Sequence, residues 1–202
     1  TILFTLISFT SIAVLGFWKV HREFTSLETE VTVSWFQILN AFFIVSFASL
    51  FSKLWEKYWN PSGPVKFALG LFFVGFSFLV VAYGASDIPQ GAAAGAVRVS
   101  MIWLILAYFF QTMGELCLSP VGLSYVSKLS PKRLIGLIFG LWFMASAISN
   151  MIAAQMGGMI DSISAEYSLS VFFLIIAALP IAVGFILLLM NPMLKKKMHG
   201  IN

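Results

Sequence analysis

Charged side chains are scarce in this chain of 202 residues, since Asp, Glu, Lys and Arg together make up only 10% of it. A soluble domain carries about 25% charged residues, so a soluble enzyme is excluded. The single cysteine, Cys117, excludes an intrachain disulfide and therefore a secreted disulfide scaffold. The sequence also lacks HExxH, GxSxG and a Walker-type glycine loop, and its two histidines lie far apart, outside the apolar runs. Metal catalysis and nucleotide hydrolysis have no residues to carry them, and no cofactor is expected.

Apolar residues take the place of the missing charges. They make up 60% of the chain, with 21 Phe and 6 Trp, and the mean hydropathy is +0.96. One small soluble core could not hide so many large apolar side chains, so the composition indicates a membrane protein. The net charge of +4 does not indicate nucleic-acid binding, because the basic residues fall in short groups between apolar runs.

Six apolar stretches are long enough to cross a membrane, which takes about 20 residues as a helix. They do not alternate apolar and polar residues as the strands of a membrane barrel would, so the fold class predicted is an all-α membrane protein with six transmembrane helices. The predicted spans are Thr1 to Val20, Ser34 to Leu54, Val65 to Ala85, Val99 to Val126, Leu134 to Met156, and Leu169 to Met190.

Basic residues alternate between the two sides of these spans. Nine of the twelve flank the second connection, the fourth connection and the C-terminus. By the positive-inside bias, these three segments are expected in the cytoplasm. The nine are Lys53, Lys57, Lys66, Lys128, Lys132, Arg133, Lys195, Lys196 and Lys197.

Glu115 is the polar residue most out of place, because it lies midway along the fourth span, where an ionisable side chain is costly. Gln111 and Ser119 lie one turn away on the same helical face, and Pro120 removes one backbone donor beside them. Glu115 is either a structural carboxyl, protonated and bonded to a neighbouring helix, or a group that lines a substrate or proton path. We favour the second interpretation, because other spans carry polar faces as well.

Two other spans carry such faces. In the second span, Gln37 and Asn40 lie three residues apart, as interhelical glue or as binding groups. In the fifth span, Trp142 and Ser146 lie four residues apart. Gly136 and Gly140 on that span form a GxxxG pair, for which close helix packing is the favoured interpretation. Several polar faces on different helices favour a shared cavity.

The stretch GELCLSPVGLSYVSKL, from Gly114 to Leu129, closely resembles the tenth-helix motif of the proton-dependent oligopeptide transporters, a branch of the major facilitator superfamily. SWFQILNAFFIV from Ser34 resembles the family's eighth helix, PVKFALGL from Pro64 the start of its ninth, and GLIFGLWFMASAISN from Gly136 its eleventh. The resemblance covers Val33 to about Lys197.

The resemblance implies that residues 1–202 form the C-terminal six-helix bundle of a twelve-helix transporter. Residues 34–197 would be helices eight to twelve, and residues 1–20 a divergent seventh helix or an extra helix beside it. The start at Thr1 in an apolar run, with no initiating Met, likewise indicates a piece of a longer protein. The implied partners are the N-terminal six-helix half, the bilayer, protons and a di- or tripeptide.

Site residues are also implied by the resemblance. Glu115 would meet the amino terminus of the peptide, and Asn40 would be the eighth-helix amide near the substrate. Trp142 and Ser146 would form the eleventh-helix wall of the pocket, with Ser119 close to Glu115. The function expected is proton-coupled symport of di- and tripeptides by alternating access, in an inner or plasma membrane, with the C-terminus in the cytoplasm. A transporter of another small solute such as nitrate, or a six-span structural or channel subunit, remains the alternative.

Overall fold

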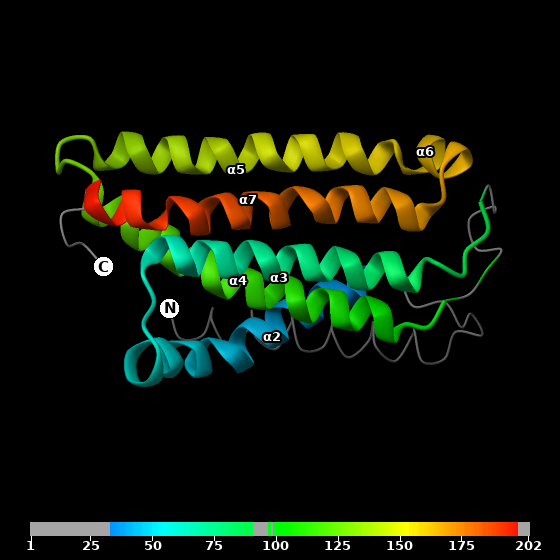
Figure 1. The fold of residues 1–202 in the computed structure, drawn as a ribbon, viewed down its shortest axis with the longest axis horizontal. Coiled ribbons are helices and arrows are strands. Elements are labelled where there is room, and N and C mark those ends of the chain that lie inside the picture. Colours follow the sequence, from blue (N-terminus) through cyan, green and yellow to red (C-terminus); the bar gives the residue numbers. More distant parts are fainter. Residues whose placement is uncertain (1–32, 91–96, 98, 198–202) are drawn as a thin grey trace, which may run out of the picture. The chain divides into compact units, whose positions relative to one another are not determined.

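The computed structural model describes residues 33–90, 97 and 99–197, and Phe36–Asn202 form one compact unit. Five helices in the described part are long and apolar enough to cross a membrane (Figure 1). A short π-helix, η1 (Leu54–Tyr58), continues the first of them, and a short helix, α6 (Ile160–Glu166), precedes the last. The five long helices are α2 (Val33–Lys53), α3 (Gly63–Gly84), α4 (Ile102–Leu129), α5 (Ile135–Gly158) and α7 (Leu169–Lys197).

These helices confirm five of the six predicted spans. The first predicted span, Thr1 to Val20, lies outside the described residues. α4 continues through Pro120, and α7 continues through Pro180 and Pro192. The all-helical architecture with apolar spans is therefore established for the described part of the chain.

Two segments expected as irregular connections are helical instead. Trp59 N–H donates to the Leu54 carbonyl at 2.9 Å and closes the π-helical turn η1. The Trp55 ring packs beside this turn, with its centroid 5.9 Å from that of Trp59 and 5.0 Å from Lys66 Nζ. At the other membrane side, Tyr167 N–H donates to the Ile163 carbonyl at 2.7 Å, and the resulting turn belongs to α6.

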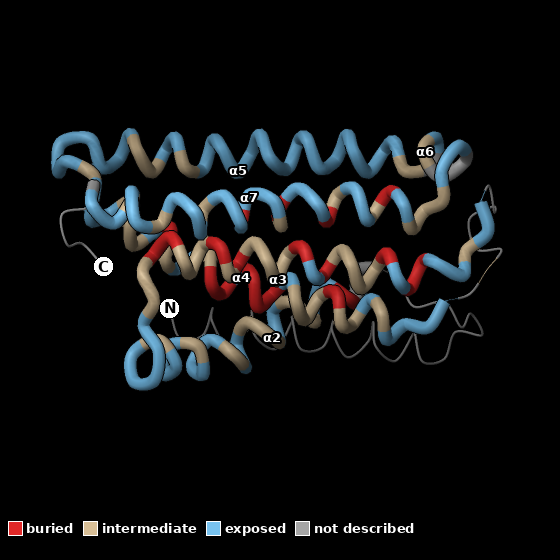
Figure 2. Tube along the Cα trace, in the orientation of Figure 1, coloured by how far each residue is buried: buried red, intermediate tan, exposed pale blue. Residues whose placement is uncertain are grey.

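α3 packs along both α4 and α7 (Figure 1), and small residues make the approach close. A Cβ added to Gly114 of α4 would lie 2.8 Å from the Gly70 carbonyl oxygen of α3. Small residues replace the hydrophobic driving force between helices in lipid, because they let backbones come together. The residues of α3 that are buried are accordingly small or cyclic, as Figure 2 shows in red: Gly63, Pro64, Ala68, Gly70, Gly75, Ser77, Ala82 and Gly84.

Hydrogen bonds fasten α3 to α7 at both ends. Ser62 Oγ, just before α3, donates to Asn191 Oδ1 at 2.8 Å. At the opposite end, Ser170 Oγ donates to the Ala82 carbonyl at 2.7 Å. The α3–α7 pair is thereby fixed in register along its whole length.

α5 has no buried residue (Figure 2). A Cβ added to Gly136 or Gly140 would meet no atom of the described residues within 4 Å. The close packing expected at this GxxxG pair is therefore not made with any element that the structure describes. Trp142 is the half-buried residue through which α5 reaches α4.

Candidate functional site

Asn40 of α2 joins two polar side chains of α4. Its Nδ2 donates to Glu115 Oε2 at 3.4 Å, and its Oδ1 lies 2.5 Å from Thr112 Oγ1. The Thr112 hydroxyl also lies 2.7 Å from the Tyr108 carbonyl oxygen, and with one hydrogen it donates to one of these acceptors at a time. These contacts form a short polar chain from the backbone of α4, through Asn40, back to the carboxyl of Glu115.

Aromatic contacts hold α2 against α4 around this chain. Phe36 stacks with Tyr108 at a centroid distance of 6.1 Å, and Phe43 and Phe47 each meet Phe109 edge-on at 5.6 Å. Phe36–Tyr108 and Asn40–Thr112 share a sequence separation of 72 residues, so the two helices run in the same direction. That direction agrees with the predicted topology, in which both helices enter from the same side.

Burial differs across the polar chain. Thr112 is fully buried, Asn40 is half-buried and Glu115 is exposed. Gln111 and Ser119 are exposed as well, so the predicted polar stripe is an open face of α4. Glu115 therefore lies on the exposed face of α4, while its amide partner Asn40 is fixed by the buried Thr112.

Trp142 and Ser146 of α5 lie farther along the bundle. A Cβ added to Gly122 would overlap Cη2 of Trp142, so the indole rests directly on the α4 backbone. Gly122 follows Glu115 by seven residues, which is about 10 Å along a helix. Ser146 Oγ donates to the Trp142 carbonyl of its own helix at 3.2 Å and is exposed. Of the five predicted site residues, Asn40 and Glu115 are brought into contact, and Trp142 contacts the same helix as Glu115.

Thr112 and Gly122 were missed by the sequence reasoning. Thr112 lies three residues before Glu115, a spacing that places both near one face of a helix. Gly122 belongs to the recognised stretch GELCLSPVGLSYVSKL, but the need for glycine there becomes visible only once Trp142 is in place.

A hollow of about 230 Å³ lies between α2, η1 and α4, beyond Glu115 toward Pro120. One acidic side chain, Glu56, reaches it, and Glu56 Oε1 accepts a hydrogen bond from Ser52 Oγ at 3.2 Å. Its lining residues are Ala48, Phe51, Ser52, Trp55, Glu56, Leu116, Pro120 and Val121.

The site is suited to binding rather than to covalent chemistry. Among the residues that the structure describes, no group of three His, Cys, Asp or Glu side chains could hold a metal ion. A carboxylate accepts hydrogen bonds and attracts a cation, and a neighbouring amide supplies a further polar contact. A ligand with a positively charged donor group fits such a pair.

The sequence also matches a known protein family. The sequence model of the POT family matches residues 4–179. The chain is 40% identical over 174 residues to the uncharacterized transporter YclF of Bacillus subtilis, covering 85% of this chain and 33% of YclF. It is 35% identical over 167 residues to the peptide transporter YePEPT of Yersinia enterocolitica, covering 81% and 32%. The chain thus spans about a third of the length of the curated relatives it matches.

Two solved structures of POT transporters are also similar to this chain. A peptide transporter POT in complex with sulfate matches with a TM-score of 0.64 and 37% identity, over 81% of this chain and 32% of that one. A POT family transporter in complex with a thioalcohol-conjugated peptide matches with a TM-score of 0.66 and 28% identity, over 76% and 30%.

Proposed function

Because the chain belongs to the POT family, we propose that it is the C-terminal six-helix bundle of a proton-coupled symporter of di- and tripeptides. In this proposal residues 34–197 are helices eight to twelve of the transporter, and residues 1–20 are a divergent seventh helix or an extra helix beside it. One of the named relatives, YePEPT, is a peptide transporter, which supports a peptide substrate. The observation that carries the proposal is the hydrogen bond from Asn40 of α2 to Glu115, a carboxyl in the middle of the long apolar helix α4.

Glu115 binds the positively charged amino terminus of the peptide in this proposal. Within the part of the chain that the structure describes, it is the one acidic or basic residue in the middle of a long helix. An ammonium group brings three donors, and a carboxylate offers acceptors to them. Asn40, held by Thr112, orients the carboxylate, so less side-chain freedom is lost when the peptide binds.

The remaining proposed site residues surround that anchor. Trp142, supported on Gly122, supplies a rigid apolar plane for a peptide side chain. Ser146 and Ser119, both exposed, supply hydroxyls on the neighbouring faces of α5 and α4. The opposing wall comes from the N-terminal six-helix half, and access alternates when one bundle rocks against the other. The bundle lies in an inner or plasma membrane with its C-terminus in the cytoplasm.

The function is tested by uptake into proteoliposomes that contain the full-length transporter. An imposed inward proton gradient is expected to drive accumulation of dialanine, and excess nitrate is expected not to compete. Accumulation of nitrate instead of peptide would assign the chain to another solute. Equal uptake with and without the gradient would overturn symport.

Glu115→Gln keeps the size of the side chain and removes its charge. Peptide affinity is expected to fall by about 1.5–3 kcal/mol, the range for hydrogen bonds to charged groups. A peptide with an acetylated amino terminus should bind weakly to both proteins, because it carries no ammonium group. Glu56→Gln, in η1, serves as the matched control and should leave affinity unchanged, because Glu56 lines the separate hollow near Pro120. A lower melting temperature with unchanged affinity would instead make Glu115 a structural carboxyl.

A further inference from the structure

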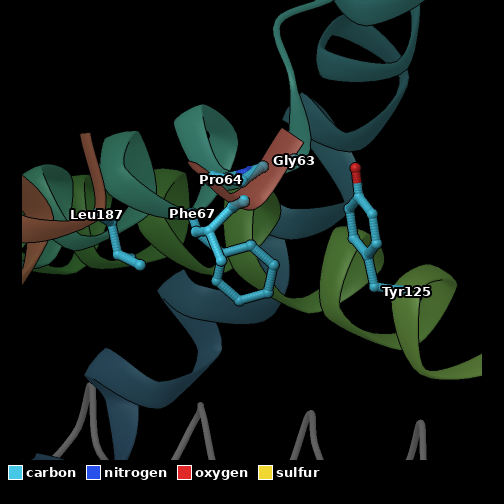
Figure 3. A pocket seen from close by; sticks show the side chains of 6 residues that line it. Gly63, Pro64, Phe67, Tyr125 and Leu187 are labelled. Atoms are coloured by element: carbon cyan, nitrogen blue, oxygen red, sulfur yellow. The ribbon is translucent and has the colours of Figure 1, made fainter. Parts of the chain in front are cut away.

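An apolar cavity lies where α3 begins and where α4 and α7 approach their ends (Figure 3). Its volume is about 160 Å³. No charged side chain lines it. The lining residues are Gly63, Pro64, Phe67, Tyr125, Leu187 and Leu194.

The chemistry of this cavity selects an apolar occupant. Water needs two to four polar partners, and an engineered cavity of about 150 Å³ lined by Leu, Ile and Phe stays dry and binds small apolar molecules. Among the lining side chains, Tyr125 carries a polar atom, its hydroxyl. This hydroxyl sits against Gly63, and a Cβ added to Gly63 would overlap it. The space that remains is therefore bounded by carbon.

One wall of the cavity belongs to α7, a helix long and apolar enough to cross a membrane. α7 carries no charged residue from Leu169 to Leu194, and Leu179 and Leu189 are 70% and 79% exposed. The lining residues Leu187 and Leu194 are both half-buried, so part of this wall is exposed at the surface of the bundle. Asn40 and Glu115, on α2 and α4, do not line the cavity.

Positive charge stands at the same end of the cavity. Lys195 directly follows Leu194, and it lies one turn after Asn191, which accepts a hydrogen bond from Ser62 beside α3. Lys195 therefore lies on the side of α7 that faces α3, and it is exposed. Basic pockets between helices at the cytoplasmic face suit anionic lipid headgroups.

We propose that this cavity holds a segment of an acyl chain of an anionic phospholipid, with the phosphate of that lipid at Lys195. The apolar lining takes this segment, and Lys195 selects a negatively charged headgroup over a zwitterionic one. This lipid site does not depend on the peptide site, because none of the residues that line the cavity belongs to the Asn40–Glu115 contact.

The proposal is tested on the full-length transporter, delipidated and then mixed with equal amounts of phosphatidylglycerol and phosphatidylcholine. Native mass spectrometry is expected to show one retained phosphatidylglycerol in preference to phosphatidylcholine. Leu187→Trp, which fills the cavity, should lower that retention about tenfold, the effect of displacing two methylene groups. Lys195→Gln should lower it about fivefold, the effect of one lysine at the membrane surface.

Two matched variants serve as controls. Leu189→Trp places the same bulk on the opposite, exposed face of α7. Lys196→Gln removes the same charge one residue further along, about 100° around the helix and farther from Leu194. Both should retain phosphatidylglycerol like the unmodified protein, and melting temperatures should agree across the set. Equal retention of the two lipids, or full retention of phosphatidylglycerol by Leu187→Trp, would overturn the proposal.

Discussion

The indole of Trp142 occupies the space in which any side chain at position 122 would have to lie. This contact is how α5 reaches α4, and it depends on Gly122 having no Cβ. Gly122→Ala should therefore displace Trp142 and destabilise the protein by about 1–3 kcal/mol, the usual effect of overpacking. Thermal melting of the purified full-length transporter measures the loss, and peptide affinity should fall with it if Trp142 is a pocket wall.

Gly136→Ala is the matched control, because a Cβ there meets no described atom within 4 Å. Its melting temperature should change little. Equal destabilisation by Gly122→Ala and Gly136→Ala would contradict the assignment of Trp142 to the α4 surface.

Thr112→Val tests whether the amide of Asn40 orients the Glu115 carboxyl. Valine keeps the shape of the buried threonine but leaves Asn40 Oδ1 without the donor that now lies 2.5 Å away. The loss of a buried hydrogen-bond partner costs about 1–3 kcal/mol. We expect weaker peptide binding, measured by calorimetry, because Asn40 is free to turn away from Glu115.

Thr112→Ser retains the hydroxyl and should bind peptide nearly as well as the unmodified protein. If serine and valine at position 112 weakened binding equally, the methyl group and not the hydrogen bond would be the important feature.

The five helices could be predicted from sequence because the criterion is local: about 20 apolar residues in a row form a span wherever they occur. The contact of Asn40 with Thr112 could not, because it depends on the axial alignment of two helices 72 residues apart. The π-helical turn η1 was not predicted either, because the contact of its Trp55 with Lys66 depends on how η1 and α3 lie relative to each other. The roles of Asn40, Glu115, Trp142, Ser146 and Ser119 in binding stay predictions.

Membrane topology is the next prediction. Lys132→Cys and Glu166→Cys, each on a Cys117→Ala background, place single thiols at two exposed positions. Lys132 is expected in the cytoplasm and Glu166 outside, because nine basic residues against three favour that orientation. A membrane-impermeant maleimide applied to intact cells should label only Glu166→Cys, and labelling of both from outside would contradict the orientation.

Residues 1–202 alone should not accumulate peptide under a proton gradient. The polar face with Glu115 would lack its opposing wall, and a carboxyl beside lipid costs several kcal/mol unless it is protonated. Co-expression with the upstream half should restore uptake in proteoliposomes. Gradient-driven accumulation by the isolated fragment would show that the bundle is not half of a transporter.

The fastening of α3 to α7, by Ser62 with Asn191 and by Ser170 with the Ala82 carbonyl, has a mechanical consequence. The two helices cannot slide past each other or separate at their ends without breaking at least one of these hydrogen bonds. The α3–α7 pair is therefore stiff. We expect the bundle to deform during a transport cycle in α5, which has no buried residue, and at the end of α2, where the π-helical turn η1 follows.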